Sequence, residues 1–247
     1  CAPFENVYTL ALRGLHDRAM NASNDMADRK QMLQDALMAQ RKMLIDATGK
    51  RGEDIPQAFT PYKEVLDVYD EGLELPDDVT IIWPDDNYGY MKRLSSPKEQ
   101  KRSGRSGVYY HSSYLGKPHD HLWMNTTSPT LMYEELRKAY DMTADRIWLL
   151  NAGDIKSCEF AVDFFLSMAY DIDSFDFDRA ATYRTEWLCG MLGDEYRNEY
   201  QDVINSFYKL AFARRPEFMG WGYQWATDKH GRERNTDTDF SLTNYRE

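Results

Sequence analysis

A run of apolar and β-branched residues that stops at a polar cluster recurs along the chain. Its clearest example covers 79–83, Val-Thr-Ile-Ile-Trp, and ends at Pro84, which is followed by Asp85, Asp86 and Asn87. Because proline cannot donate to a sheet ladder, the strand ends there and the polar side chains follow its carboxyl end. In α/β folds this end of a strand faces the ligand crevice, so the pattern predicts one wall of a site.

Four further apolar runs have the same form, and we predict strands over 7–12, 55–59, 108–111 and 146–150. Apolar residues at helical spacing predict helices between and after these strands. The expected helices are 26–47, 65–71, 131–140 and 160–170. Alternation of strand, polar end and helix argues for a parallel sheet with crossover helices.

The strand signals stop beyond residue 174. The segment 180–212 has an apolar helical stripe that is broken near Gly190 and Gly193, and 217–247 is polar and aromatic without clear periodicity. We therefore expect one domain over 1–175 and the start of a helical domain over 176–247.

Five strand–helix units are fewer than the eight of a closed β/α barrel. Either the sheet is open and doubly wound, or the first strands of a barrel precede Cys1. The sequence has no Gly-rich phosphate loop, which argues against a nucleotide enzyme. The chain does not begin with Met, and its first residues lead into a strand, so we interpret it as an internal fragment.

Composition narrows the classes of partner. The formal net charge of −11 argues against nucleic acid or an anionic membrane as a partner. The aromatic content of 14% suits a sugar-binding cleft, although most aromatic residues in any chain pack in the core. Three scattered cysteines form neither a disulfide framework nor a zinc motif. No apolar run approaches the roughly 20 residues of a membrane-spanning helix.

The polar residues at the strand ends include carboxylates from different strands, with arginine, asparagine and tyrosine between them. Cleavage of a glycosidic bond needs one carboxylic acid that protonates the leaving oxygen and a second carboxylate that activates water or attacks the sugar. Arginine can hold a planar carboxylate through two hydrogen bonds, a geometry that lysine lacks. The candidate residues are Arg13, Asp17, Glu64, Asp85, Asp86, Asn87, His111, Tyr114, Asn151 and Asp154.

Each of these residues also has a structural interpretation. Arg13 and Asp17 are spaced as an ion pair one helical turn apart. Asp85 and Asp86 suit the cap of a turn or helix, and Glu64 suits the exposed face of a helix.

Three histidines, His111, His119 and His121, suggest a metal, but their spacing fits no zinc motif, and we expect no metal or cofactor. A sugar-phosphate isomerase is a weaker interpretation, because no phosphate cradle is visible.

Long motifs with aromatic and acidic residues in fixed order run through nearly the whole chain. Through them the sequence resembles glycoside hydrolase family 115, the α-glucuronidases that remove glucuronic acid side groups from xylan. The motifs lie at 8–17, 62–65, 83–90, 107–114, 118–120 and 146–156.

The resemblance implies the later part of a (β/α)8 TIM-type barrel followed by the start of an α-helical domain. It also implies inverting hydrolysis of an α-linked glucuronate or 4-O-methylglucuronate, with Asp17 and Glu64 as the acid/base pair and Arg13 on the uronate carboxylate. Which carboxylate is the acid stays open. The further substrate-binding candidates are Asn87, Tyr114 and Asn151, and then Asp85, Tyr109 and His111.

The implied partner is xylan or a xylo-oligosaccharide, and the implied location of the parent protein is the periplasm or the secreted fraction. A homodimer of the full-length protein stays open. The fragment alone is expected to be inactive, because site residues from upstream strands are missing. The alternative function is that of a non-catalytic carbohydrate-binding relative with the same fold.

Overall fold

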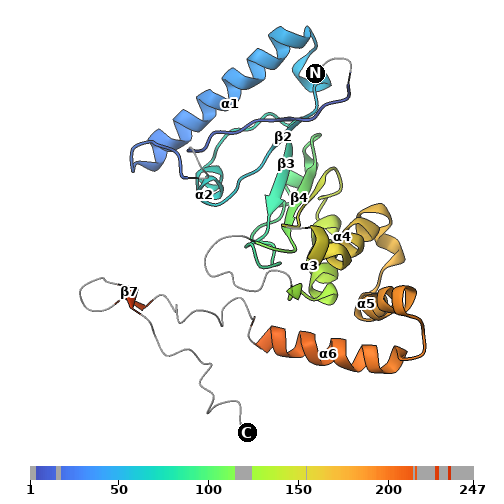
Figure 1. Cartoon of the computed structure of the whole chain (residues 1–247). Helices are drawn as coiled ribbons and strands as arrows, with labels where there is room; N and C mark the ends of the chain where they lie inside the picture. The colour runs from blue at the N-terminus through green and yellow to red at the C-terminus, as the bar shows by residue number, and fades with distance from the viewer. Residues whose placement is uncertain are drawn as a thin grey trace. The chain divides into compact units, whose positions relative to one another are not determined.

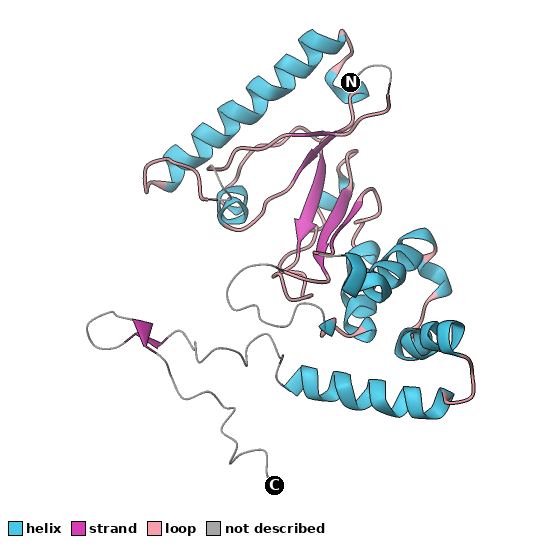
Figure 2. Ribbon diagram, viewed as in Figure 1, coloured by secondary structure: helices cyan, strands magenta, loops and turns pink. Residues whose placement is uncertain are grey.

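A computed structural model of the 247-residue chain describes residues 4–14, 18–114, 124–153, 155–213, 215, 226–227 and 233–234. Five strands form one sheet in the order β1-β2-β3-β4-β5, and the pairs from β1 to β4 are parallel (Figures 1 and 2). This confirms the predicted α/β class with a parallel sheet. The strands are β1 (Tyr8–Thr9), β2 (Gln57–Phe59), β3 (Thr80–Pro84), β4 (Ser106–His111) and β5 (Trp148–Asn151).

The helices follow the apolar periodicity of the sequence. The longest begins where Asp25 accepts a hydrogen bond from the amide of Ala27, at 2.7 Å, and it ends at Gly49, which has a φ of 67°. The α-helices are α1 (Met26–Thr48), α2 (Glu64–Asp70), α3 (Pro129–Asp141), α4 (Ile155–Tyr170), α5 (Phe177–Leu192) and α6 (Arg197–Ala213). Short 3-10 helices are η2 (Gly52–Asp54), η3 (Glu99–Lys101) and η5 (Ile172–Ser174), and β6 (Ala226–Thr227) pairs antiparallel with β7 (Glu233–Arg234).

The break expected near Gly190 and Gly193 is confirmed: the chain turns at Gly193, whose φ of 96° favours glycine, while Gly190 stays inside α5. Some bounds differ from the sequence prediction, since the first strand, expected over 7–12, covers only Tyr8–Thr9. The helix expected from residue 160 already begins at Ile155. The segment between β3 and β4 contains the short helix η3.

The chain divides into two compact units. One contains Cys1–Asp86, Met91–Tyr110 and Leu136–Leu149, and the other contains Asn87–Tyr90, His111–Glu135 and Leu150–Glu247. The predicted boundary near residue 175 remains a prediction.

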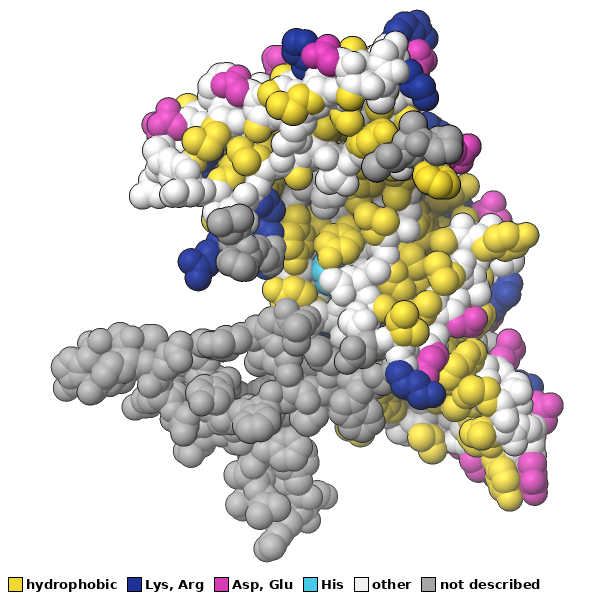
Figure 3. Space-filling model, turned by 45° about the horizontal axis from the view of Figure 1, so that its top comes forward, with side chains coloured by type: hydrophobic (Ala, Val, Ile, Leu, Met, Phe, Trp, Pro, Cys, Tyr) yellow, Lys and Arg dark blue, Asp and Glu magenta, His cyan; other side chains and the backbone are white. Residues whose placement is uncertain are grey.

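The first unit has a core of side chains from α1, α2, β2 and β3. Leu33 and Leu37 of α1 are almost fully buried, as are Phe59, Ile81 and Trp83 of the two strands. The exposed side of α1 carries acidic and basic side chains together (Figure 3). All residues of β3 are buried, so both faces of this strand lie in the core. This explains why the sequence of β3 is a continuous apolar run.

A close approach of two strands explains one glycine in the same unit. A Cβ atom on Gly107 of β4 would lie 2.0 Å from the carbonyl oxygen of Ile147, where no side chain fits. The amide of Val108 donates to that oxygen at 2.9 Å, which fixes β5 beside β4.

The second unit has an aromatic core between α4 and α5. Phe164 is fully buried and meets the ring of Tyr183 edge-on, with centroids 5.1 Å apart. Trp187 contacts Phe160 in the same way at 5.7 Å. No helix among the residues described here is long and apolar enough to cross a membrane.

Candidate functional site

Two of the predicted site residues, Arg13 and Glu64, form a bidentate ion pair. Arg13 donates from Nε and from Nη2 to the two carboxylate oxygens of Glu64, each at 3.0 Å. Their side chains are 19% and 22% exposed, so solvent reaches the pair only in part. Charge-assisted forks of this kind are among the stronger hydrogen-bonded pairs in proteins.

The fold brings these residues together across 51 positions of sequence. Strand β1 lies beside β2, with Tyr8 opposite Gln57, so the chain segments that leave the two carboxyl ends are neighbours. Arg13 follows β1, and Glu64 is the first residue of α2, just after β2. The ion pair of Arg13 with Asp17 considered from spacing falls outside the described residues, because Asp17 lies there.

The ring of Tyr62 lies at the centre of this group. The Cζ atom of Arg13 is 5.4 Å from the ring centroid, and the ammonium nitrogen of Lys63 is 5.1 Å from it. Tyr109, from β4, meets the same ring edge-on at 5.8 Å. Cations lie favourably over the face of an aromatic ring, so Tyr62 holds both side chains near Glu64.

Asp85 lies at the end of β3, as the sequence predicts, but its side chain is buried at 1% exposure. Its amide donates to the carbonyl of Tyr109 at 3.1 Å, which extends the pairing of β3 with β4 beyond Pro84. Its role in substrate binding, implied by the family resemblance, stays a prediction. Of the predicted residues that the structure describes, the first unit holds Arg13, Glu64, Asp85, Asp86 and Tyr109.

Among the described residues, the other predicted site residues belong to the second unit. His111, buried at the end of β4, meets the ring of Tyr114 edge-on at 5.6 Å, and Tyr114 meets Tyr88 at 6.2 Å. Asn151 ends β5, and its carbonyl accepts hydrogen bonds from the amides of Ser112 and Ser113.

The backbone of Asn87 has a φ of 74°, a conformation that asparagine tolerates better than most residues. Asn87 is partly buried and precedes Tyr88 on the loop after β3. It belongs to the same unit as Tyr114.

The sequence analysis did not single out Arg215. Its guanidinium donates to the carbonyl of Tyr88 and to the hydroxyl of Thr127, at 3.2 Å for the second bond. It also lies 5.8 Å from the centroid of the Tyr88 ring. A separation of 127 residues gives no local signal for such a contact.

Several predicted residues lie outside the described residues, namely Asp17, His119, His121 and Asp154. Within the described residues, no three His, Cys, Asp or Glu side chains come together in a way that could hold a metal ion.

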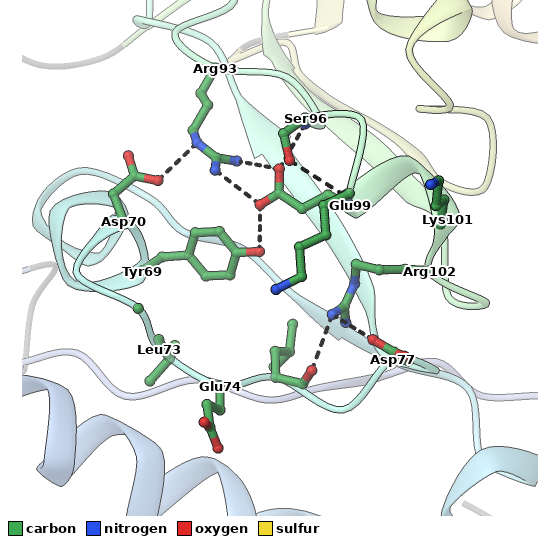
Figure 4. Close-up of a pocket in the computed structure, with 13 residues that line it drawn as sticks. Tyr69, Asp70, Leu73, Glu74, Asp77, Arg93, Ser96, Glu99, Lys101 and Arg102 are labelled. Atoms are coloured by element: carbon green, nitrogen blue, oxygen red, sulfur yellow. Dashed lines mark hydrogen bonds and ion pairs between the residues drawn. The ribbon is translucent and has the colours of Figure 1, made fainter.

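A second polar cluster of the first unit lies in a pocket of about 830 Å³ (Figure 4). Glu99 accepts hydrogen bonds there from Arg93, from the hydroxyl of Tyr69 at 2.7 Å and from the amide of Ser96 at 2.7 Å. Arg93 also pairs with Asp70 at 2.8 Å and lies 4.5 Å from the ring centroid of Trp83.

The pKa values in this cluster reflect the several hydrogen bonds that the carboxylate of Glu99 accepts at once. Burial alone raises the pKa of Glu99, but the hydrogen bonds from Arg93, Ser96 and Tyr69 outweigh it and lower the pKa from 4.5 to about 2. Burial, with the hydrogen bond to Glu99, raises the pKa of Tyr69. Glu99 therefore stays ionised and fully bonded, which fits a structural role.

Glu64 differs from Glu99 in its donors: within the described residues, its carboxylate accepts hydrogen bonds from Arg13 alone. An arginine that already holds one planar carboxylate also has the geometry to hold the carboxylate of an acidic ligand.

Comparison with known proteins agrees with this chemistry. The profile of Glycosyl hydrolase family 115 matches residues 1–218. One similar solved structure is described as a novel family GH115 4-O-methyl-α-glucuronidase, BtGH115A, with specificity for decorated arabinogalactans. It is 42% identical, with a TM-score of 0.81 over 87% of this chain. This chain spans 28% of that protein's length, and no curated protein matches it. The chain belongs to glycosyl hydrolase family 115.

Proposed function

We propose that the full-length protein hydrolyses α-linked glucuronic acid or 4-O-methylglucuronic acid side groups of a plant polysaccharide. The observation that carries this proposal is the family match over 1–218, which includes Arg13 and Glu64. The fork between these two residues supports it, because a site for a uronic acid needs an arginine that can hold a planar carboxylate.

The proposed mechanism is inverting. Asp17 and Glu64 serve as the general acid and base on opposite faces of the sugar, with about 6.5–9.5 Å between their carboxyl groups to admit water. Arg13 holds the uronate carboxylate, and Asn87, Tyr114 and Asn151 hydrogen-bond the sugar. Asp85, Tyr109 and His111 are the further substrate-binding candidates; Tyr109 also meets the ring of Tyr62, and Asp85 and His111 are buried at the strand ends.

Two polysaccharides are candidates for the substrate. The family resemblance implies glucuronoxylan, with the α-1,2-linked side group, and xylan or a xylo-oligosaccharide as the partner. BtGH115A, in contrast, has specificity for decorated arabinogalactans. The glucuronate side group is common to both polysaccharides, so we propose that Arg13 recognises the uronate. The preference for one backbone polymer is then determined by other parts of the full-length protein.

The full-length protein is proposed to complete the sheet to a (β/α)8 barrel upstream of this chain and to continue into a helical domain from about residue 176. We further propose a periplasmic or secreted location, and a homodimer as one assembly to examine.

The test is an NMR assay of full-length protein with 4-O-methylglucurono-xylo-oligosaccharide and, separately, with a glucuronate-decorated arabinogalactan. Early release of the β-anomer from either substrate supports inverting α-glucuronidase chemistry. Early α-anomer overturns the inverting mechanism. A folded protein that binds the sugars but releases none overturns the enzymatic proposal and leaves the carbohydrate-binding alternative.

A further inference from the structure

The residue before Glu64 has a strained backbone. Lys63 has a φ of 52° and a ψ of −122°, a combination that glycine adopts easily and residues with a Cβ atom rarely adopt. The amide of Val65 donates to the carbonyl of Tyr62 at 3.1 Å, which closes a tight turn around Lys63 and Glu64. Strained residues cluster at functional sites, so a lysine at a position suited to glycine, beside Glu64, is a candidate for a functional side chain.

The side chain of Lys63 extends toward the aromatic platform that Arg13 also uses. Its ammonium nitrogen lies 5.1 Å from the centroid of the Tyr62 ring, and the Cζ atom of Arg13 lies 5.4 Å from the same centroid. Lys63 is partly buried, as is Tyr62. Two cations therefore lie around one ring, next to the carboxylate of Glu64.

The charge of this group selects a ligand class. Arg13 and Lys63 contribute two positive charges and Glu64 contributes one negative charge, so these three described neighbours of the Tyr62 ring sum to +1. A sugar with a single carboxylate complements this charge, whereas a neutral sugar does not. The Nε–Nη2 edge of Arg13 is bonded to Glu64, so a second cation beside it would help Arg13 hold the carboxylate of a ligand while that pair stays intact.

We propose that Lys63 is a specificity-determining residue that binds the carboxylate of the uronic acid side group and sets the preference for the acid over neutral sugars. This inference rests on the proposed function and adds a residue to its site. It explains why the turn keeps a lysine despite the strained backbone.

The test uses the full-length protein with Lys63→Gly, Lys63→Arg and Thr143→Gly. Thr143, with a φ of 72°, is a matched control, because it lies between α3 and β5 and takes no part in the Tyr62 platform. The substrates are the 4-O-methylglucuronate oligosaccharide and its methyl ester, which has no charge. We measure kcat, KM and the melting temperature of each variant.

We expect Lys63→Gly to reduce kcat/KM for the acid by roughly 10- to 100-fold, mainly through KM, with little change for the ester. Its melting temperature should not fall, because glycine relieves the strain. Lys63→Arg should recover part of the activity, and Thr143→Gly should leave it unchanged. Unchanged discrimination between acid and ester in Lys63→Gly would overturn the inference.

The inference about Lys63 can be tested even if the proposed enzymatic function is wrong. If the wild-type protein releases no sugar, calorimetric binding of glucuronate and its methyl ester decides the inference. Binding of glucuronate that is lost in Lys63→Gly would support it without catalysis, and equal binding by both proteins would reject it.

Discussion

The first unit contains two arginine–glutamate forks with similar geometry and different surroundings. In the Arg13–Glu64 pair both hydrogen bonds are 3.0 Å long, and in the Arg93–Glu99 pair they are 2.9 and 3.2 Å. The carboxylate of Glu99 has two further donors, the amide of Ser96 and the hydroxyl of Tyr69, whereas the carboxylate of Glu64, within the described residues, is bonded by Arg13 alone. The two pairs thus have similar hydrogen-bond lengths and differ in the number of donors to the carboxylate.

The number of partners separates a structural pair from an exchangeable one. A carboxylate held by several donors cannot leave one of them without losing a network, and networks are stronger than their separate bonds. A carboxylate held by one arginine can exchange that arginine for a proton or a substrate. The strained turn at Lys63, beside Glu64, is a second sign of a functional site.

The largest effect that sharpens this comparison is expected for Arg13→Lys. Lysine keeps the charge but cannot form the fork, so kcat/KM for glucuronate release by the full-length protein should fall about 100-fold, with a stability change below about 1 kcal/mol. Steady-state kinetics and thermal unfolding measure the two effects. Arg93→Lys is the matched control, with unchanged kinetics and lower stability. Equal losses of activity in both variants would remove the distinction.

The next effect is expected for Glu99→Gln. The change removes the charge from a carboxylate that accepts four hydrogen bonds and leaves Arg93 with Asp70, so we expect a loss of about 1–3 kcal/mol in the free energy of unfolding. Urea denaturation measures this loss, and the kinetics of the folded variant should match those of the wild type. A loss below about 0.5 kcal/mol would show that the cluster contributes little.

A pH dependence follows from the same carboxylate. The pKa of Glu99 is lowered from 4.5 to about 2 on folding, so its contribution is complete above pH 4.5 and is lost as the pH falls toward 2. Allowing for partial exposure to solvent, the contribution is about 1–2 kcal/mol. The stability difference between wild type and Glu99→Gln should therefore shrink between pH 4.5 and pH 2. A constant difference over this range would contradict the assignment.

A smaller effect is expected for Tyr69→Phe, which removes one donor to Glu99 and keeps the ring. We expect a loss of about 1 kcal/mol in unfolding free energy, because Arg93 and Ser96 still hold the carboxylate. Thermal unfolding of the wild type, this variant, Glu99→Gln and the variant with both changes forms a double-mutant cycle. Additive losses would show that the two groups do not interact.

Much of the fold could be predicted because each strand has a clear local signal. The run at 79–83 is buried on both faces, and Pro84 ends it, so pattern and structure agree there. The same signal located the polar strand ends that carry Glu64, Asp85 and Asn151. The break between α5 and α6 could be placed only near two glycines, because glycine also occurs inside helices, and the φ of Gly193 decides between them.

The contacts of the site could not be predicted from local patterns. The pairing of Arg13 with Glu64 depends on the register of β1 against β2, and the contact of Arg215 with Tyr88 crosses 127 residues. The unusual backbone of Lys63 is also invisible in the sequence, since lysine is common in helices and loops alike. Burial of Asp85 and His111 likewise results from packing between elements distant in sequence.

The most direct test of the central claim compares Glu64→Gln with Glu99→Gln in the full-length protein, by glucuronate release and by urea unfolding. If Glu64 is a catalytic carboxylate and Glu99 a structural one, Glu64→Gln should lower kcat by about 10²–10⁴ with little change in stability. Glu99→Gln should lower stability and leave kcat unchanged. Full activity of a folded Glu64→Gln protein would contradict the account.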